Sequence, residues 1–251
     1  PGFPITENDK KELLTLNCRY ETADFIGADG SSTLVPVANA FGKLREVVPE
    51  KVAEYIESKK LYKQYFFVRD LYEKYNVKKS RVEHTYGVVK AAIILAGIYG
   101  ADVKKAILAS LLHDCGKYVT VRDLEQKGFC FDDEAKSALP PVEHCYTSEA
   151  IARCDLKIND EEVLRAIRLH TTGDENMSTL EKIVFCADYI EEGRTTPGVE
   201  QIRKKILFDL DGAMLDILGA TINYLKSKNA EIDKRTLACR DRLEKTIKKE
   251  N

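Results

Sequence analysis

LLHDCGK, residues 111–117, places a histidine and an aspartate side by side at the end of an apolar run. Adjacent residues on a helix point in different directions, so an amphipathic pattern alone cannot bury both side chains. The longer stretch DVKKAILASLLHDCG (102–116) predicts a helix with Asp102 as its N-cap and Gly116 at its end. His113 and Asp114 therefore lie near a helix end, where they need partners from elsewhere in the chain.

The bulk composition is that of a globular protein with a substantial hydrophobic core. The chain has 251 residues, of which 44% are hydrophobic and 32% charged, enough for one large domain or two small ones. Its net charge of −2 gives no electrostatic case for binding nucleic acid or an anionic membrane. No apolar run approaches the roughly 20 residues that span a bilayer, and no signal-peptide pattern opens the chain. These features predict a cytoplasmic protein.

The seven cysteines are scattered along the chain, and no two of them form a CxxC pair. An odd number without regular spacing favours reduced thiols, buried or free, over a disulfide framework. The same spacing argues against a thiolate zinc site, so we expect any metal to be bound by other side chains.

Apolar residues recur at helical spacing over most of the chain, and no run of alternating strands is present. One segment opens with a capping box, Ser178 to Glu181. The predicted fold is therefore all-α. We expect a helical domain at residues 66–228, a charged C-terminal helix at 229–251, and a small, partly irregular N-terminal segment at 1–65. The expected helices cover residues 50–61, 81–100, 102–116, 159–170, 178–193, 198–226 and 231–249.

The chain has only four histidines, and all of them fall inside the predicted helical domain. Each lies on or beside a different predicted helix and has apolar neighbours. A lone histidine of this kind is most simply a core or surface residue with local hydrogen bonds. Four of them on different helices favour a shared site. They are His84, His113, His144 and His170.

Asp188 lies in the stretch KIVFCADYI (182–190), where apolar residues surround it on nearly every face of the predicted helix. Burying an ionised carboxylate without a partner costs several kcal/mol. The nearest cations in sequence, Lys182 and Arg194, are each six residues away, not at the helical contact spacings of three or four. A metal ion is therefore the better partner. Imidazole and carboxylate ligands suit iron, manganese, cobalt or zinc.

Four histidines together with Asp114 and Asp188 are too many ligands for one tetrahedral zinc with an open position. They suit two ions that share a bridging carboxylate, which Asp114 can provide beside His113. Such a pair converts a bridging water into hydroxide at neutral pH and stabilises the oxygens of an in-line phosphoryl displacement. The implied reaction class is hydrolysis of a phosphate ester or anhydride.

The order of these residues resembles that of the metal-dependent phosphohydrolases of the HD superfamily. Three neighbouring motifs point to one family within this superfamily. They are HTTG (170–173), ADYIEEGR (187–194) and PGVEQIR (197–203). With these pieces, about residues 66–226 are similar to the YqeK-type symmetrical bis(5'-nucleosyl)-tetraphosphatases. That resemblance implies an all-α HD-domain bundle with a pair of metal ions, iron or a similar metal. It also implies that a metal-bridging hydroxide hydrolyses diadenosine tetraphosphate to two ADP.

The resemblance also distributes the ligands between the two ions. One ion would be bound by His84, His113, Asp114 and Asp188, and the other by Asp114, His144 and His170. Asp114 would then belong to both ions and would be a catalytic residue.

Five further residues would bind the substrate. Lys117, three residues after Asp114, would neutralise a phosphate and act in catalysis. The turn after the last histidine, Thr171 to Gly173, offers a hydroxyl and backbone N–H groups to phosphate oxygens, and Arg194 could pair with a phosphate through two hydrogen bonds. The structural alternatives are that Lys117 and Gly173 serve only the ends of their helices and that Arg194 is solvated. The set is Lys117, Thr171, Thr172, Gly173 and Arg194.

Residues 31–62 resemble a different family, the C-terminal end of bacterial nicotinate-nucleotide adenylyltransferase. Pro36 replaces the arginine of that family's closing motif, and no histidine precedes residue 84, so the transferase's HxGH site is absent. We interpret residues 1–65 as the remnant or cut end of a transferase–hydrolase fusion. A first residue other than Met is compatible with a fragment. The matching pieces are Ser31–Thr33, Gly42–Lys43, Val48–Val52, Tyr55–Ile56 and Leu61–Tyr62.

Two alternative functions stay open from the sequence. One is an HD phosphohydrolase that acts on another nucleotide, although HDCGKY lacks the acidic pair of alarmone hydrolases and the chain has no GYP motif. The other is a non-catalytic, nucleotide-binding HD module. The expected partner is a small-molecule nucleotide, with ADP as product and no nucleic acid or membrane, and a homodimer is compatible with the resemblance. The sequence does not decide the metal, the nucleobase preference, the oligomeric state or the role of residues 1–62.

Overall fold

The structure is a computed structural model that describes residues 32–250 of the chain. The chain divides into two compact units, residues 1–65 and residues 66–251. Ser31 and the rest of residues 1–31, which the sequence assigned to the N-terminal segment, lie outside the described residues.

Within residues 32–65, the first unit has three short helices that bury a small apolar core. Pro36 occupies the first turn of its helix, where a missing N–H costs nothing, and is buried there. The helix expected at 50–61 ends at Ser58, and Lys60 then adopts a φ of +55°. Asn39 Nδ2 donates to the carbonyl of Leu61 at 3.0 Å and holds the end of the unit in place. The helices are α2 (Val35–Ala40), α3 (Leu44–Val47) and α4 (Glu50–Ser58).

The second unit is helical throughout, and residues 32–250 contain no β-strand, which confirms the all-α prediction. Two predicted helix starts are also confirmed. Asp102 accepts from the amides of Lys104 and Lys105, and Ser178 forms the expected capping box with Glu181. The helices are α5 (Phe67–Lys74), α6 (Lys79–Tyr99), α7 (Val103–Leu112), α8 (Val121–Glu125), α9 (Asp133–Lys136), α10 (Pro140–Cys154), α11 (Glu161–Leu169), α12 (Thr179–Ile190), α13 (Val199–Lys205), α14 (Leu210–Ser227) and α15 (Lys234–Glu250).

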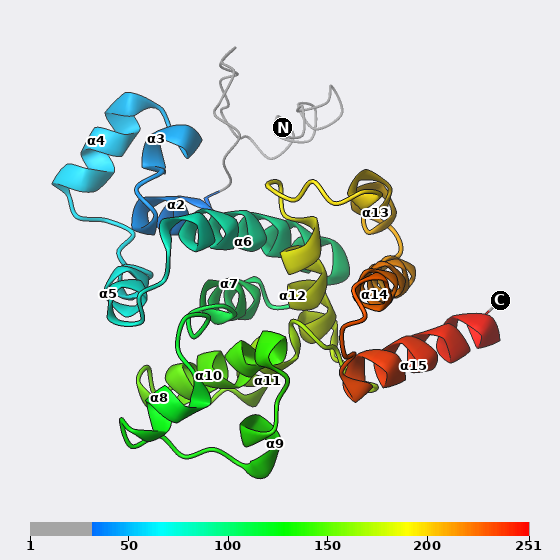
Figure 1. Cartoon of the computed structure of the whole chain (residues 1–251). Coiled ribbons are helices and arrows are strands. Elements are labelled where there is room, and N and C mark those ends of the chain that lie inside the picture. Colours follow the sequence, from blue (N-terminus) through cyan, green and yellow to red (C-terminus); the bar gives the residue numbers. More distant parts are fainter. Residues whose placement is uncertain (1–31, 251) are drawn as a thin grey trace, which may run out of the picture. The chain divides into compact units, whose positions relative to one another are not determined.

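Five helices of the second unit build the core around the site. The long helix α6 packs against α7 and α12, α11 packs against both α7 and α12, and α10 packs against α11 (Figure 1). The facing positions are filled by fully buried aliphatic side chains, such as Val88 on α6, Leu111 on α7 and Ile167 on α11. Helix α14 also packs against α12, and α15 packs against α14. Within residues 32–250, no helix combines the length and apolarity that a membrane span requires.

In the second unit, two predicted helices differ clearly from the observed ones. The single helix expected at 198–226 is broken between α13 and α14, because Asp209 caps α14 by accepting from the amide of Gly212 at 2.8 Å. The helix expected to end at Gly116 ends at Leu112. Gly116 is drawn instead toward α10, where its amide donates to Ser148 Oγ at 2.9 Å. The resulting turn lets the residues after α7 face inward.

Candidate metal centre

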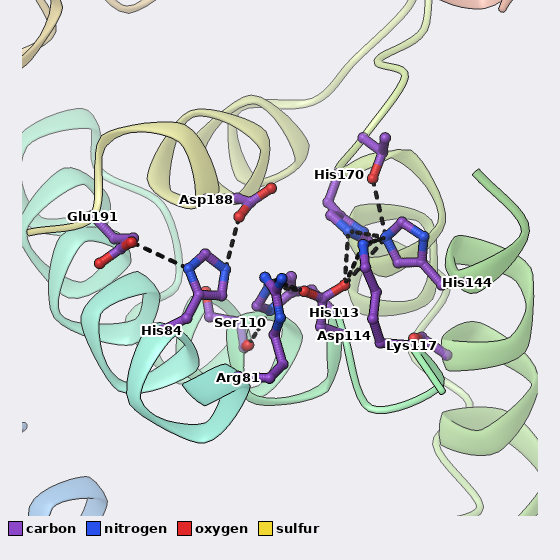
Figure 2. A network of polar contacts seen from close by, with 12 residues as sticks. Arg81, His84, Ser110, His113, Asp114, Lys117, His144, His170, Asp188 and Glu191 are labelled. Atoms are coloured by element: carbon purple, nitrogen blue, oxygen red, sulfur yellow. Dashed lines mark hydrogen bonds and ion pairs between the residues drawn. The ribbon is translucent and has the colours of Figure 1, made fainter. Parts of the chain in front are cut away.

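The structure brings the six predicted metal ligands together from five places on the core helices (Figure 2). His84 and His144 lie in the early turns of their helices, and Asp188 lies near the end of its helix. Two helices end immediately before a ligand, so His113, Asp114 and His170 lie at or just past helix ends. Five of the six come from α6, α10, α12 and the ends of α7 and α11, and Asp114 follows His113 directly.

The first ligand group gathers around Oδ1 of Asp114. Nε2 of His144 lies 3.1 Å from this oxygen and 3.0 Å from Nε2 of His170. Nε2 of His170 lies 3.6 Å from the same oxygen. Two ligand atoms that are each about 2.1 Å from one metal, at angles of roughly 90–120°, lie about 3.0–3.6 Å apart. The three atoms therefore have the spacing of ligands to one ion.

The second ligand group lies on the other side of Asp114. Its Oδ2 is 3.4 Å from Nε2 of His113, and Nε2 of His84 is 2.9 Å from Oδ1 of Asp188. Ligand atoms of His84, His113 and Asp114 all lie within 4.8 Å of one another. The two carboxylate oxygens of Asp114 thus face two different groups of ligands, as a bridging carboxylate would.

Three buried atoms of these groups support the fit to metal ions. Among the described residues, Nε2 of His84, Nε2 of His113 and Oδ1 of Asp114 have no hydrogen-bond partner of acceptable geometry. A buried polar atom without a partner costs about 1–3 kcal/mol, so such atoms are rare unless a ligand satisfies them. Four imidazoles and two carboxylates are the donor set of a borderline transition metal. The residues present therefore fit a pair of such ions.

The second nitrogen of two ligand imidazoles is already held by a backbone carbonyl. Nδ1 of His113 lies 2.6 Å from the carbonyl of Ser110, and Nδ1 of His170 lies 2.8 Å from the carbonyl of Ile167. A carbonyl only accepts, so in both rings Nδ1 carries the proton. Nε2 then keeps its lone pair and points toward the other ligands, which is the tautomer that binds a metal.

Two of the buried groups have protonation states that suit metal binding. Burial by itself would raise the pKa of the Asp114 carboxyl, but the imidazoles of His113, His144 and His170 hold it well below its usual range. Burial lowers the pKa of the His113 imidazole below its ordinary value. An ionised carboxylate and a neutral imidazole are the forms that bind a metal. Burial by itself would lower the pKa values of the His144 and His170 imidazoles as well. Cys145 and Asp114 outweigh this effect and raise both pKa values, so a metal bound there would displace a proton.

Asp188 differs from its sequence-based description. The sequence favoured a metal over Arg194 as its partner, but Nη2 of Arg194 lies 3.0 Å from its Oδ1 and Nε of Arg194 donates to its backbone carbonyl at 3.1 Å. The chain turns back after α12 ends at Ile190, which returns Arg194 to the helix end. The Asp188 side chain is also 20% exposed rather than enclosed on every face. The other nearby cation, Lys182, pairs with Asp211 instead.

The structure places some of the predicted substrate-binding residues beside the ligand groups and buries others in the turn. Lys117 Nζ lies 2.8 Å from Nε2 of His144, and Thr171 Oγ1 lies 3.3 Å from the same atom. Thr172 and Gly173 are buried instead, with the Thr172 hydroxyl donating to the carbonyl of Gly173 at 3.0 Å. Lys117 and Thr171 therefore border the ligand groups, whereas the next two residues pack within the turn.

Comparison with known proteins identifies the family. A family model described as "HD domain" matches residues 81–193, which contain all six ligand candidates. Three bacterial relatives named "Bis(5'-nucleosyl)-tetraphosphatase, symmetrical" are 34–43% identical to this chain. The one from Halalkalibacterium halodurans is 43% identical over 177 residues, which cover 67% of this chain and 91% of that protein. The chain belongs to this HD-domain family.

A solved structure and a second type of relative extend the comparison. The crystal structure of a "predicted HD superfamily hydrolase involved in NAD metabolism" from Clostridium acetobutylicum is 35% identical to this HD-domain protein, with a TM-score of 0.65. The match covers 73% of this chain and 98% of that chain. A Mycoplasma genitalium protein named "Probable nicotinate-nucleotide adenylyltransferase/Ap4A hydrolase" is 29% identical over 153 residues, 60% of this chain and 41% of that protein. That name joins the two families that the sequence resembles.

Three residues of the HD domain's centre were missed by the sequence analysis. Nη1 of Arg81 lies 2.9 Å from Oδ2 of Asp114, and Oε1 of Glu191 lies 3.2 Å from Nδ1 of His84. Cys145 is fully buried, with its Sγ 3.9 Å from Nε2 of His144. The one sequence signal for Arg81 was its position three residues before His84, which places both on one helix face. Glu191 and Cys145 gave no comparable signal.

Proposed function

We propose that this HD-domain protein cleaves dinucleoside tetraphosphates symmetrically, converting diadenosine tetraphosphate into two molecules of ADP. The observation that carries the proposal is the division of Asp114, whose Oδ1 faces His144 and His170 while its Oδ2 faces His113. Two ligand groups around one shared carboxylate suit a two-metal, in-line phosphoryl displacement. The high similarity to relatives named for symmetrical tetraphosphate cleavage supports the choice of substrate.

The chain's own residues would hold the reacting groups and balance their charge. A bound metal pair would supply Lewis-acid polarisation of the phosphate oxygens and an activated water at neutral pH. The carbonyls of Ser110 and Ile167 fix two ligand imidazoles in the tautomer that leaves Nε2 free. Asp114 contacts both ligand groups and would fix their separation, so the centre depends on it more than on any single histidine.

Two cations approach opposite oxygens of Asp114. Arg81 Nη1 lies 2.9 Å from Oδ2, and Lys117 Nζ lies 3.4 Å from Oδ1. A substrate phosphorus attacked at this carboxylate would have one cation on each side. Lys117 and Arg81 would then offset the negative charge of both halves of the tetraphosphate in the transition state. Charge balanced on both sides supports cleavage at the centre of the phosphate chain.

We also propose iron as the metal pair, as the family resemblance implies, with manganese, cobalt and zinc as the alternatives that the same donor set accepts. Metal analysis of protein purified without added metal distinguishes these ions.

The nucleotide-binding role and a cytoplasmic location belong to the same proposal. The cytoplasmic location is supported by the six cysteines of the described residues, all of which are unpaired. Light scattering in solution tests the homodimer and a nucleic-acid titration tests the expected lack of binding.

The proposal assigns a role to each part of the chain. Residues 66–228 would be the catalytic domain, since all six ligand candidates lie there. Residues 229–251 would be its C-terminal helix. Residues 1–65 would be an appended remnant of the transferase without transferase activity, because the buried Pro36 takes the place of a phosphate-contacting arginine.

Product analysis tests the proposed activity. The full chain, supplied with ferrous iron or manganese, is incubated with diadenosine tetraphosphate in water enriched in ¹⁸O. We expect ADP as the only nucleotide product, with one labelled oxygen in one of every two ADP molecules. ATP and AMP as products would contradict central cleavage. Turnover of other nucleotides but not of tetraphosphates would favour the alternative HD phosphohydrolase.

A further inference from the structure

A pocket of about 440 Å³ opens next to the ligand group of His144. One wall is the turn formed by residues 117–120, and the other is the start of α10, from Pro140 to His144. Lys117 and His144 line this pocket and also belong to the polar network in Figure 2, so pocket and network adjoin. The volume falls within the range of about 300–1,000 Å³ that is usual for small-molecule sites.

We propose that this pocket binds one nucleoside of the substrate, with its base stacked on Tyr118. This inference rests on the proposed function, because it takes the substrate to be a nucleotide whose phosphates lie at the ligand groups. It adds a residue and a subsite that neither the sequence motifs nor the ligand geometry assigned.

The walls of the pocket are preformed. Thr147 Oγ1 donates to the carbonyl of Gly116 at 2.9 Å, and the amide of Gly116 donates to Ser148 Oγ at 2.9 Å. On the other side of the turn, the amide of Val121 donates to Glu143 Oε1 at 2.7 Å. The turn is thus attached to α10 at both of its ends. A ligand would enter a rigid site and would not have to order it.

The pocket suits the uncharged part of a nucleotide better than its phosphates. A helix N-terminus normally attracts anions through its free N–H groups. Here the first two positions of α10 are Pro140 and Pro141, which have no N–H to donate. Their rings present an apolar surface to the pocket instead. The ammonium group of Lys117 lies where the pocket meets the ligand groups, so the phosphates would point toward it.

Tyr118 is the aromatic side chain of the pocket. The ammonium group of Lys78 lies 4.7 Å from the centre of its ring and so covers one face of that ring. A base stacks on the remaining face, which is a sequence-tolerant mode of binding to aromatic residues. Glu143 uses Oε1 to hold the turn, and no hydrogen bond from the described residues reaches its Oε2. That oxygen can accept from the exocyclic amino group of adenine or guanine.

Binding of ADP and of pyrophosphate to the metal-loaded full chain tests the inference. We expect Tyr118→Ala to weaken ADP binding by about tenfold or more, and Tyr118→Phe to retain it, because only the ring is needed to stack. Pyrophosphate has no base, so its dissociation constant should be the same in all three proteins. Tyr224→Ala is the matched control, since Tyr224 is 62% exposed on α14 and outside the pocket.

A fluorescent variant gives a direct readout of stacking. The chain contains no tryptophan, so Tyr118→Trp introduces a single reporter. ADP should quench its emission, and pyrophosphate should not.

Each outcome decides the inference. Equal ADP affinity of the parent and Tyr118→Ala would overturn it, and so would a Tyr118→Ala protein that loses pyrophosphate and ADP binding alike. ADP binding that depends on Tyr118, in a protein that does not cleave tetraphosphates, would leave the subsite in place and reject the proposed function. Symmetrical cleavage of tetraphosphates with an unchanged KM in Tyr118→Ala would support the proposed function and reject the subsite.

Discussion

Replacing Glu191 by glutamine tests whether the partner of a ligand imidazole sets the affinity of one metal. Oε1 of Glu191 lies 3.2 Å from Nδ1 of His84, where it can accept the ring proton and leave Nε2 for a metal. Its Oε2 accepts from the amide of Gly193 at 2.6 Å. Glutamine keeps the size of the side chain and removes its charge, so the variant changes the electrostatics of His84 with little change in packing.

The expected effect is a weaker affinity for one of the two ions. Removing such a partner weakens metal binding by about 10- to 100-fold, which corresponds to about 1.4–2.7 kcal/mol. The Glu191 side chain is only 6% exposed, so water cannot replace the lost interaction and we expect the upper part of that range. His84 belongs to the second ligand group alone. The ion held by Asp114, His144 and His170 should bind with its affinity unchanged.

The metal-free chain is titrated with manganese or cobalt, and calorimetry measures the affinity of each of the two metal ions. The matched control is Glu192→Gln, because Glu192 is the next residue but is 64% exposed and pairs with Lys90 on the surface. We expect the control to bind both equivalents like the parent. Unchanged affinity for both ions in folded Glu191→Gln would refute the reasoning. Equal weakening of both ions would refute the division into two ligand groups.

Two further predictions concern the bridging carboxylate and the stability of the second unit. Asp114→Ala should lose measurable turnover and both metal equivalents while circular dichroism stays native, and near-normal activity would overturn the site. Asp155 accepts from Lys74 at 2.5 Å and from the Tyr75 hydroxyl; burial would raise its pKa, but these contacts hold it below its usual value. A depressed pKa stabilises the fold above the unfolded-state pKa of about 3.9, and this stability is lost as the pH falls through the folded value. Asp155→Asn should therefore lower the free energy of unfolding at pH 7 by about 1–2 kcal/mol. In denaturant titrations, the difference between the variant and the parent should shrink as the pH falls below about 4. A difference that stays constant with pH would contradict the assignment.

The helices that the sequence predicted have local signals, whereas α10, which carries His144, was not among them. Capping residues such as Asp102 and Ser178 mark helix starts through contacts within three residues, and these contacts are present in the structure. The break between α13 and α14 was missed, since the apolar periodicity of 198–226 continues across it. The backbone leaves helical geometry at Asp209, whose side chain accepts from the amide of Gly212 and caps the next helix.

Partners across the fold were not predictable in the same way. A metal was preferred to Arg194 as the partner of Asp188 because helical spacing was the only guide to its neighbours. The chain reverses after α12 and brings Arg194 to it. Arg81 and Glu191 were missed for the same reason, since their contacts with Asp114 and His84 depend on how α6, α7 and α12 pack. Contacts between segments far apart in sequence leave no periodic signal.

The sequence by itself determined the helical fold class and the candidate donor set of the proposed centre. Four histidines and two aspartates among apolar residues have few physical explanations, since burying such groups without partners is costly. The tertiary structure alone decided that the two oxygens of Asp114 face different ligand groups. It also decided which cations reach them and that a pocket lies between the 117–120 turn and α10. These features depend on where helix ends meet in space, which the packing of side chains sets and no local pattern records.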